Sequence, residues 1–371
     1  LNRNLLLSRA INLRSFPINY TLFVTSTCKY TKLVLSSKLF FSVDMICRMS
    51  GGLLTSHQSK NRNMAKYGLI GDPIKGSGSP ALFETAYKGV KDGEYSYDLI
   101  EGSDFEASFQ RFIDEYAAVN VTAPFKERAY SKVLEMVRKG EGAVSGPAAR
   151  IGATNLLVKG SNGIEAYNSD FTGIVTAVVE AYFPGIVEEF IGNFGDKFFV
   201  KMHQFFLMTL SRTFNRQPQA LVVGCGGAGR AAAVAAAELG FATILMNRTP
   251  EKARAIAEAM PEYGFLPDPI SDFKEAVKEC DLVIYTLPMA LPEIAEFTAD
   301  DFAGEDSGQR KVILEANYKT PSFDDEARMK LTSADCTYIS GRRWLLYQAL
   351  TGYSIMTGLQ PDLKAMSEVV F

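Results

Sequence analysis

Histidine is nearly absent from the 371-residue sequence, which contains only His57 and His203. A histidine-based catalytic triad or a metal centre of several histidines is therefore hard to build, and any general acid must be another residue. No apolar run of about 18 residues or more occurs, so the sequence predicts no membrane span. The cysteines show no CxxC pair and no regular spacing: Cys28, Cys47, Cys225, Cys280 and Cys336. This indicates packing thiols in a reducing compartment, with no disulfide framework and no metal site.

Acidic residues are almost missing from residues 1–63, which hold nine Lys or Arg and one acid, Asp44. This basic, Ser-rich leader fits an organellar transit peptide. The same leader fits equally an upstream stretch that was wrongly included in the reading frame, and we favour this interpretation. In either case we do not expect residues 1–63 to be part of the fold. The rest of the chain carries 41 acidic and 30 basic residues, which argues against a nucleic-acid partner.

From Met64 onward, short apolar runs alternate with helical patterns, which predicts an α/β protein of two domains. The first domain is expected at 64–169, with the C-terminal helix 343–371 folded back onto it. Its last part, 152–170, reads as a hairpin with Asn-Gly at the turn. Residues 170–216 are expected to be a linker helix and an insertion, because the Phe-rich part after 183 has no clear period. The second domain is expected at 217–342.

The stretch ALVVGCGGAGRAAAVAAAELGFATILMNRT, residues 220–249, has the pattern of a dinucleotide-binding unit. A buried strand ends at Gly224, the pattern continues with Gly226 and Gly229, and an Ala-rich helix and a second strand follow. The three glycines would allow a tight turn, a close approach to a pyrophosphate, and close packing of helix on strand. A Gly-rich turn in another α/β protein is the alternative.

The end of the second strand indicates which cofactor binds. An NAD site places Asp or Glu there, whereas this chain has Arg248 and no acid until Glu251. A guanidinium fits a 2′-phosphate, so the sequence predicts NADP. A surface arginine is the alternative, although a cation at a helix start opposes the helix dipole unless an anion binds there. The predicted cofactor-binding residues are Gly224, Gly226, Gly227, Ala228, Gly229, Asn247, Arg248 and Thr249.

A single lysine, Lys126, follows an apolar strand in VNVTAPFKERAY, residues 119–130. Pro124 stops the strand and stiffens the turn, and a lysine held still on such a turn can serve as an acid or base. From the lysine alone, a solvated turn residue is the favoured interpretation.

Several separated motifs together resemble those of the shikimate dehydrogenase family, in the family's order and from about Met64 to Gly358. They are GDPIKGSGSP, NVTAPFK, GATNLLV, YNSDFTG, GCGGAGRA with NRTPEKA, and YQALTGYSIMTG. The resemblance implies an N-terminal α/β substrate domain followed by a Rossmann NADP-binding domain. It also implies reversible NADPH-dependent reduction of 3-dehydroshikimate to shikimate.

By this resemblance Lys126 and Asp170 are the catalytic pair. Ser77 and Ser79 would bind the substrate carboxylate; they lie two apart, so in extended chain both hydroxyls would face one side. The remaining substrate-binding residues implied by the motifs are Thr122, Asn155, Gln348 and Tyr318. Taken singly, the serines could serve a turn and an N-cap, Asn155 a turn, and Gln348 a helix surface.

The sequence departs from the family at Gly76 and Phe125, where histidine is common, at TLPMALP, and at Trp344, where methionine is usual. A quinate and shikimate dehydrogenase of relaxed cofactor use, a non-catalytic NADP-binding regulatory relative, and another NADP reductase remain alternatives. We expect a cytoplasmic location and no metal, and the sequence leaves a homodimer open.

Overall fold

The computed structural model describes residues 8–12, 21–27, 30–31, 65–88, 95–303 and 310–370. The chain divides into two compact units, Leu1–Leu54 and Thr55–Phe371. In the first unit, β1 (Ser8–Asn12) pairs antiparallel with β2 (Thr21–Thr27), which pairs antiparallel with β3 (Tyr30–Thr31). The two interpretations of the leader stay predictions, and Cys28, Cys47 and His57 lie outside the described residues.

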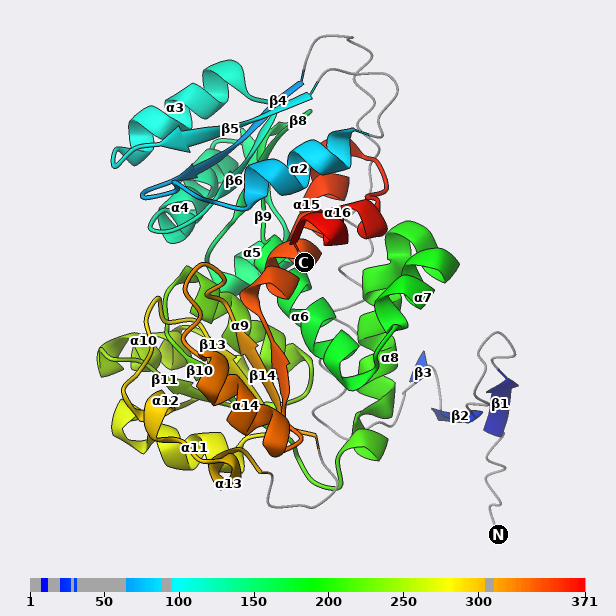
Figure 1. Cartoon of the computed structure of the whole chain (residues 1–371). Helices are drawn as coiled ribbons and strands as arrows, with labels where there is room; N and C mark the ends of the chain where they lie inside the picture. Colours follow the sequence, from blue (N-terminus) through cyan, green and yellow to red (C-terminus); the bar gives the residue numbers. More distant parts are fainter. Residues whose placement is uncertain are drawn as a thin grey trace. The chain divides into compact units, whose positions relative to one another are not determined.

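The second unit contains two six-stranded sheets, each covered by helices (Figure 1). We call the part built on the earlier sheet the first lobe and the part built on the later sheet the second lobe. The sequence-based prediction of an α/β fold with a Rossmann unit is confirmed. The boundaries predicted for separate domains stay a prediction.

The first-lobe sheet is mixed, with strand order β5-β4-β6-β8-β9-β7. Its strands are β4 (Ala65–Gly71), β5 (Tyr95–Glu101), β6 (Ala118–Val121), β7 (Gly142–Val144), β8 (Leu156–Gly160) and β9 (Gly163–Tyr167). Helices α3 (Phe105–Glu115) and α4 (Lys126–Arg138) pack on one face through an aromatic and aliphatic core. The predicted hairpin is confirmed, because β8 and β9 pair antiparallel across a two-residue turn after Gly160.

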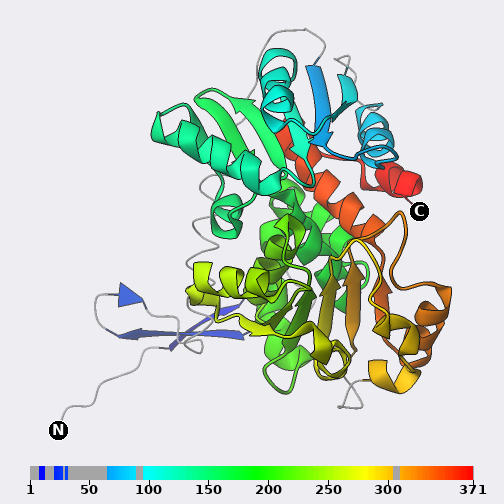
Figure 2. The ribbon, with the colours of Figure 1, turned by 90° about the vertical axis from the view of Figure 1, so that its left-hand side faces the viewer.

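The other face of this sheet is covered by helices from the two ends of the second unit. They are α2 (Ser79–Tyr87) and α15 (Gly341–Thr357), and α16 (Leu363–Val370) packs on these two helices. Stacked aromatic rings join α2 to the sheet, with Phe83 of α2 only 4.6 Å from Tyr97 of β5 between ring centroids. The C-terminal helices thus contact α2 of the first lobe, and Figure 2 shows α15 running between the lobes.

The second-lobe sheet is fully parallel, with strand order β12-β11-β10-β13-β14-β15. Its strands are β10 (Gln219–Val223), β11 (Ala242–Met246), β12 (Leu266–Asp268), β13 (Leu282–Tyr285), β14 (Val312–Glu315) and β15 (Thr337–Ile339). This order reverses at β10, the arrangement of a doubly wound nucleotide-binding sheet. The central strands are Val/Ile/Leu-rich and buried, as expected where helices cover both faces.

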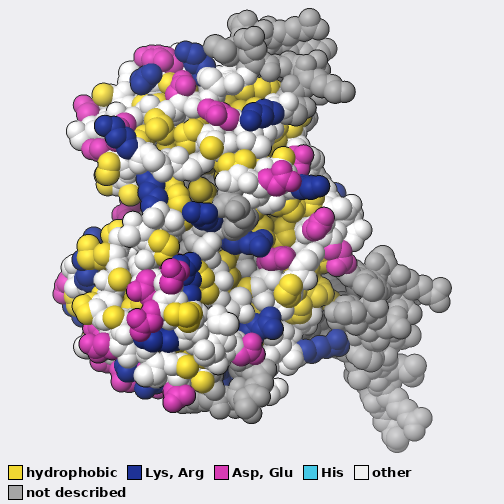
Figure 3. All heavy atoms as spheres, in the orientation of Figure 1, with side chains coloured by type: hydrophobic (Ala, Val, Ile, Leu, Met, Phe, Trp, Pro, Cys, Tyr) yellow, Lys and Arg dark blue, Asp and Glu magenta, His cyan; other side chains and the backbone are white. Residues whose placement is uncertain are grey.

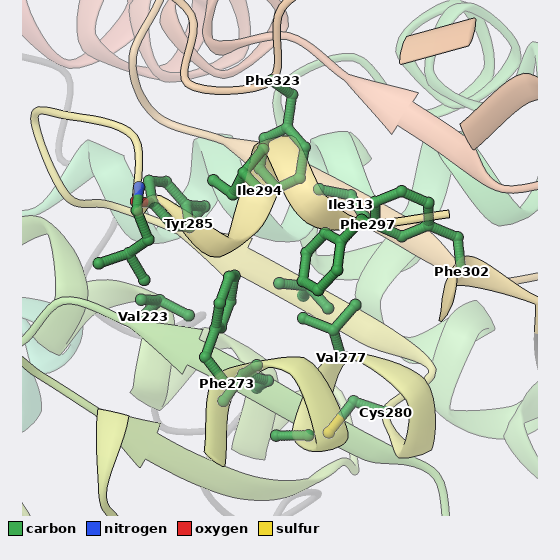
Figure 4. Close-up of a cluster of buried hydrophobic side chains, with 14 of the residues drawn as sticks. Val223, Phe273, Val277, Cys280, Tyr285, Ile294, Phe297, Phe302, Ile313 and Phe323 are labelled. Atoms are coloured by element: carbon green, nitrogen blue, oxygen red, sulfur yellow. The ribbon is translucent and has the colours of Figure 1, made fainter. Parts of the chain in front are cut away.

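One face of the second sheet packs against a core rich in phenylalanine, drawn in Figure 4. Three of its rings are in contact: the ring centroid of Phe297 lies 5.5 Å from that of Phe273 and 4.9 Å from that of Phe302. The remaining helical segments of the second lobe are α9 (Gly227–Glu238), α10 (Pro250–Ala259), η2 (Pro261–Tyr263), η3 (Ile270–Asp272), α11 (Phe273–Glu279), α12 (Glu293–Glu296), α13 (Ala299–Phe302) and α14 (Asp325–Ser333).

Between the sheets, α5 (Gly146–Ile151) and α6 (Ser169–Tyr182) lead into the Phe-rich stretch, which the sequence analysis left without secondary structure. It folds into α7 (Ile186–Phe194), η1 (Gly195–Lys197) and α8 (Phe198–Thr213). Helix α8 packs on α6, with the rings of Phe171 and Phe199 6.0 Å apart. The buried side chains of α8 lie on one face, but Val200, Phe205 and Met208 are apolar outside that face, so no single apolar stripe marks the helix in the sequence.

Candidate active site

Lys126 and Asp170 meet, although 44 positions separate them in the chain. Lys126 is the first residue of α4, and Asp170 lies in the first turn of α6. The Lys126 Nζ donates to the Asp170 Oδ2 at 2.6 Å, and their side chains are 14% and 5% exposed. The structure therefore brings together the pair that the sequence singled out and removes most of it from water.

The two charges relate differently to their helices. A carboxylate in the first turn is stabilised by the positive end of the helix dipole, whereas a cation there opposes it. Asp170 thus sits favourably on α6, and Lys126 sits unfavourably on α4. Because a buried ion pair contributes little net stability, the position of Lys126 is better explained by chemistry than by folding.

Asn155 links the start of α6 to α15. Its Oδ1 accepts from the Ser169 backbone N–H at 2.7 Å, and its Nδ2 donates to the Ser169 Oγ at 3.1 Å. The same Nδ2 lies 3.5 Å from the Gln348 Oε1. Two predicted substrate-binding residues, Asn155 and Gln348, therefore lie together beside Asp170, the residue after Ser169.

Two further polar residues extend this group, and the sequence analysis did not select them. The Tyr97 hydroxyl donates to the Asn120 Oδ1 at 2.7 Å, and the Asn120 Nδ2 donates to the Asn155 carbonyl at 3.3 Å. Burial raises the pKa of Tyr97, against a hydrogen bond with Ser79 that lowers it, so the phenol stays neutral. Asn120 stands in the NVTAPFK motif and could have been found there, whereas nothing in the sequence marks Tyr97.

The serine loop before α2 differs from the expectation. Gly78 has helical backbone angles and α2 starts at Ser79, so the chain between Ser77 and Ser79 is not extended. The Ser79 N–H donates to the Ser77 Oγ at 3.3 Å, which is the local turn role given as an alternative. The prediction of an extended chain was wrong because Gly78, between the two serines, already has the backbone angles of the helix that follows.

Tyr318 reaches this loop from the second lobe. Its hydroxyl accepts from the Gly78 backbone N–H at 3.0 Å, which places it beside both serines. Thr122 lies half-buried in the β6–α4 loop, and its N–H donates to the Ile70 carbonyl at 2.9 Å. The predicted substrate-binding residues thus form two hydrogen-bonded groups. Asn155 contacts Gln348, and Tyr318 binds Gly78, which lies between Ser77 and Ser79; Thr122 belongs to neither group.

The glycine-rich loop after β10 has the geometry that its spacing predicts. Gly224 has φ of +103°, and a Cβ on Gly229 would lie 1.9 Å from the Gly224 carbonyl oxygen. A Cβ on Gly226 would meet no atom within 4 Å. Gly226 caps α9 without a side-chain hydrogen bond, so the first N–H groups of α9 are open to a phosphate.

The nucleotide loop also touches the lysine. A Cβ placed on Gly227 would lie 3.0 Å from the Lys126 Cβ, so the starts of α9 and α4 pack directly on each other. This contact joins the predicted dinucleotide loop of the second lobe to the Lys126–Asp170 pair of the first.

At the end of β11, Asn247 has a supporting role. Its Oδ1 accepts from the Cys225 N–H at 3.0 Å, and its Nδ2 donates to the Thr249 carbonyl at 2.9 Å. Arg248 is exposed, with a guanidinium nitrogen 3.1 Å from the Met289 sulfur. These residues fit NADP, because a cation without a competing carboxylate stands where the second strand ends.

Among the described residues, no group of three or more His, Cys, Asp or Glu is arranged to hold a metal ion. Over the same residues, no helix is long and apolar enough to cross a membrane.

A doubly wound dinucleotide-binding sheet facing a Lys–Asp pair defines the class of NAD(P)-dependent oxidoreductases. Residues 69–157 match the shikimate dehydrogenase substrate binding domain, and residues 209–302 match the shikimate / quinate 5-dehydrogenase family. The chain belongs to the shikimate dehydrogenase family.

Individual relatives agree with this assignment. The chain is 28% identical over 314 residues to the shikimate dehydrogenase (NADP(+)) of Archaeoglobus fulgidus, covering 82% of this chain and 97% of the relative. It is also 28% identical over 314 residues to that of Moorella thermoacetica, covering 81% and 91%. The solved shikimate 5-dehydrogenase of Thermus thermophilus, in complex with shikimate, matches with TM-score 0.61 and 26% identity, over 83% of this chain and 98% of the other.

Proposed function

We propose that this protein catalyses the reversible NADPH-dependent reduction of 3-dehydroshikimate to shikimate. The observation that carries the proposal is the 2.6 Å contact of the Lys126 Nζ with the Asp170 Oδ2, beside the nucleotide loop at Gly227. The names of the relatives support NADP as cofactor and shikimate as substrate.

NADPH, when bound, supplies the hydride that reduces the ring ketone. As the carbonyl carbon is reduced, negative charge grows on its oxygen, and the Lys126 ammonium can stabilise that charge and donate a proton. Asp170 accepts a hydrogen bond from the ammonium and thereby orients it. In the reverse direction the neutral lysine amine accepts the proton of the shikimate hydroxyl.

The other polar residues would bind and orient the substrate. Ser77, Ser79 and Tyr318 converge around Gly78, which suits a carboxylate. Asn155 and Gln348 offer amide groups beside Asp170, which suit ring hydroxyls, and Thr122 would add a hydroxyl from the β6–α4 loop. The pyrophosphate of the cofactor would be held by the glycine-rich loop, which comprises Gly224, Gly226, Gly227, Ala228 and Gly229. The 2′-phosphate would lie among Asn247, Arg248 and Thr249.

The test is NADP reduction by the purified chain with shikimate, in the original sequence and in Lys126→Ala and Asp170→Asn. We expect kcat to fall by about 10²- to 10⁴-fold in both variants, with a much smaller change in KM. Lys132→Ala is the matched control, since Lys132 lies on the same helix but pairs with Glu106 at the surface. An unchanged kcat in Lys126→Ala would remove the catalytic assignment.

Quinate remains the alternative substrate, because the matching family includes quinate dehydrogenases. Shikimate and quinate should each be tested with NADP and with NAD. A preference for quinate with NAD would replace the proposal. A protein with no turnover that still binds NADP would be a regulatory relative, which the retained Lys126–Asp170 pair argues against.

We also propose a cytoplasmic location, supported by three thiols that are buried and free of disulfides: Cys225, Cys280 and Cys336. A homodimer stays a prediction, to be tested by sedimentation of the full chain.

A further inference from the structure

A cavity of about 430 Å³ lies in the second lobe, next to the loop after β14 and the start of α15. It is lined by Tyr318, Lys319, Pro321, Arg328, Ser340 and Arg342. Three of these side chains are cations and none is a carboxylate. Except for Tyr318, none of the six was assigned to the substrate or the cofactor above.

The cavity is electropositive for more than one reason. Ser340 is the N-cap of α15 and makes no side-chain capping bond, so the positive end of a 17-residue helix faces this region. Arg328 pairs with Asp325, but the Asp325 side chain is 93% exposed and such a pair is weak in water. On the face shown in Figure 3, Lys and Arg side chains lie along the boundary between the lobes, with Asp and Glu side chains among them.

Two lining residues also hold the first lobe. The Tyr318 hydroxyl accepts from the Gly78 N–H at 3.0 Å, and the Lys319 Nζ donates to the Lys75 carbonyl at 2.9 Å. These contacts flank the loop that carries Ser77 and Ser79. A ligand in the cavity would therefore lie beside the place proposed for the substrate carboxylate.

We propose that the cavity binds the phosphate group of a small phosphomonoester, and that this ligand opposes substrate binding. Two guanidinium groups and an ammonium match the charge and the oxygens of a phosphate dianion better than they match those of a single carboxylate. The volume of the cavity exceeds the volume of one phosphate group, which leaves room for the organic group of the ester. Because the ligand and the substrate carboxylate are both anions near Tyr318, each weakens the binding of the other.

Calorimetry on the full chain tests the site, with inorganic phosphate and glycerol 3-phosphate as probes at constant ionic strength. The titrations use an Arg248→Gln background, so that the proposed 2′-phosphate site does not bind the probe. We expect glycerol 3-phosphate to bind, and Arg328→Gln with Arg342→Gln to weaken it at least about tenfold, one charge-assisted contact or more. Tighter binding of inorganic phosphate than of the ester would overturn the ester assignment.

Arg111→Gln is the matched control, since Arg111 is an exposed arginine of α3 that pairs with Glu115. Unaltered binding in the double variant would overturn the proposal, because the anion would then bind elsewhere. Thermal unfolding of each variant shows whether it is folded. If the double variant is unstable, the single variant Arg342→Gln replaces it in the binding test, because Arg342 is exposed.

The coupling rests on the proposed function and is tested separately by kinetics. Glycerol 3-phosphate should raise the KM for shikimate about fivefold or more, with kcat unchanged, and should have no effect in the double variant. Probe binding without any change in KM would overturn the coupling. Absence of turnover with shikimate would instead reject the proposed function, while the calorimetric result would still decide the site.

Discussion

Arg150 of α5 and Glu238 of α9 form a largely buried ion pair that joins the two lobes. The Arg150 Nε lies 2.6 Å from the Glu238 Oε1, and their side chains are 15% and 7% exposed. Glu238 also accepts from the Tyr263 hydroxyl at 2.9 Å, and its backbone carbonyl lies 3.0 Å from the His203 Nε2. One carboxylate residue thus connects α5, α8, α9 and η2.

Removing this carboxylate should strongly destabilise the protein. We expect Glu238→Gln to lower the free energy of unfolding by about 3 kcal/mol or more, because the buried Arg150 charge would lose the carboxylate that pairs with it. Denaturant unfolding measures the change. The control is Glu115→Gln, which breaks the exposed pair with Arg111 and should cost less than about 0.5 kcal/mol. Equal losses in the two variants would show that Arg150 is hydrated.

Two glycines of the nucleotide loop should separate folding from cofactor binding. Gly229→Ala would place a Cβ 1.9 Å from a backbone oxygen, so we expect a loss of about 1 to 3 kcal/mol in unfolding free energy. Gly226→Ala meets nothing within 4 Å and should fold as before. Its methyl group would instead block a phosphate, and the KM for NADP should rise. An unchanged KM in folded Gly226→Ala would move the pyrophosphate away from this loop.

Arg248 should determine the preference for NADP over NAD. We expect Arg248→Gln to raise the KM for NADP about tenfold to a hundredfold, the value of one charge-assisted contact, and to leave the KM for NAD nearly unchanged. Steady-state kinetics with both cofactors measures the ratio. A parallel rise for NADP and NAD would show that the arginine supports the loop and does not contact the 2′-phosphate.

His203 should make stability fall in mild acid. Burial lowers the pKa of His203 below its ordinary value, so the folded protein releases a proton that the unfolded chain still holds. The stabilisation is complete above the unfolded-state pKa of about 6.5 and is lost as pH falls below it, by up to about 1.4 kcal/mol per pH unit. His203→Gln, compared at pH 7.5 and 5.5 by chemical unfolding, should lose less stability than the original protein. Identical losses would mean that His203 does not titrate on unfolding.

The sequence predicted those parts of the fold that a local pattern specifies. The glycines at 224, 226 and 229 each have a steric role that their spacing already indicates, and the hairpin turn follows from Asn-Gly. Helix α8 was missed because Phe205 and Met208 are apolar outside its buried face, which blurs the periodicity on which a helix prediction depends.

The site was predictable where motifs carry it and unpredictable where tertiary packing does. Lys126 and Asp170 stand in separate motifs, and only the fold shows that their side chains meet. Tyr97 of β5 reaches Asn120 of β6 across the intervening strand β4, and a tyrosine in a strand resembles any packed aromatic residue. The geometry of the serine loop was predicted wrongly because Gly78 between the serines has helical backbone angles, which the motif does not specify.

The contact between Gly227 and Lys126 has a mechanical consequence. The stem of the lysine rests on the first turn of α9, with no side chain between them to absorb a shift. A displacement of that turn by an arriving dinucleotide is transmitted directly to the ammonium, and movement of the ammonium by a ring substrate is transmitted back. The two ligands should therefore alter each other's affinity by the same factor, as reciprocity requires.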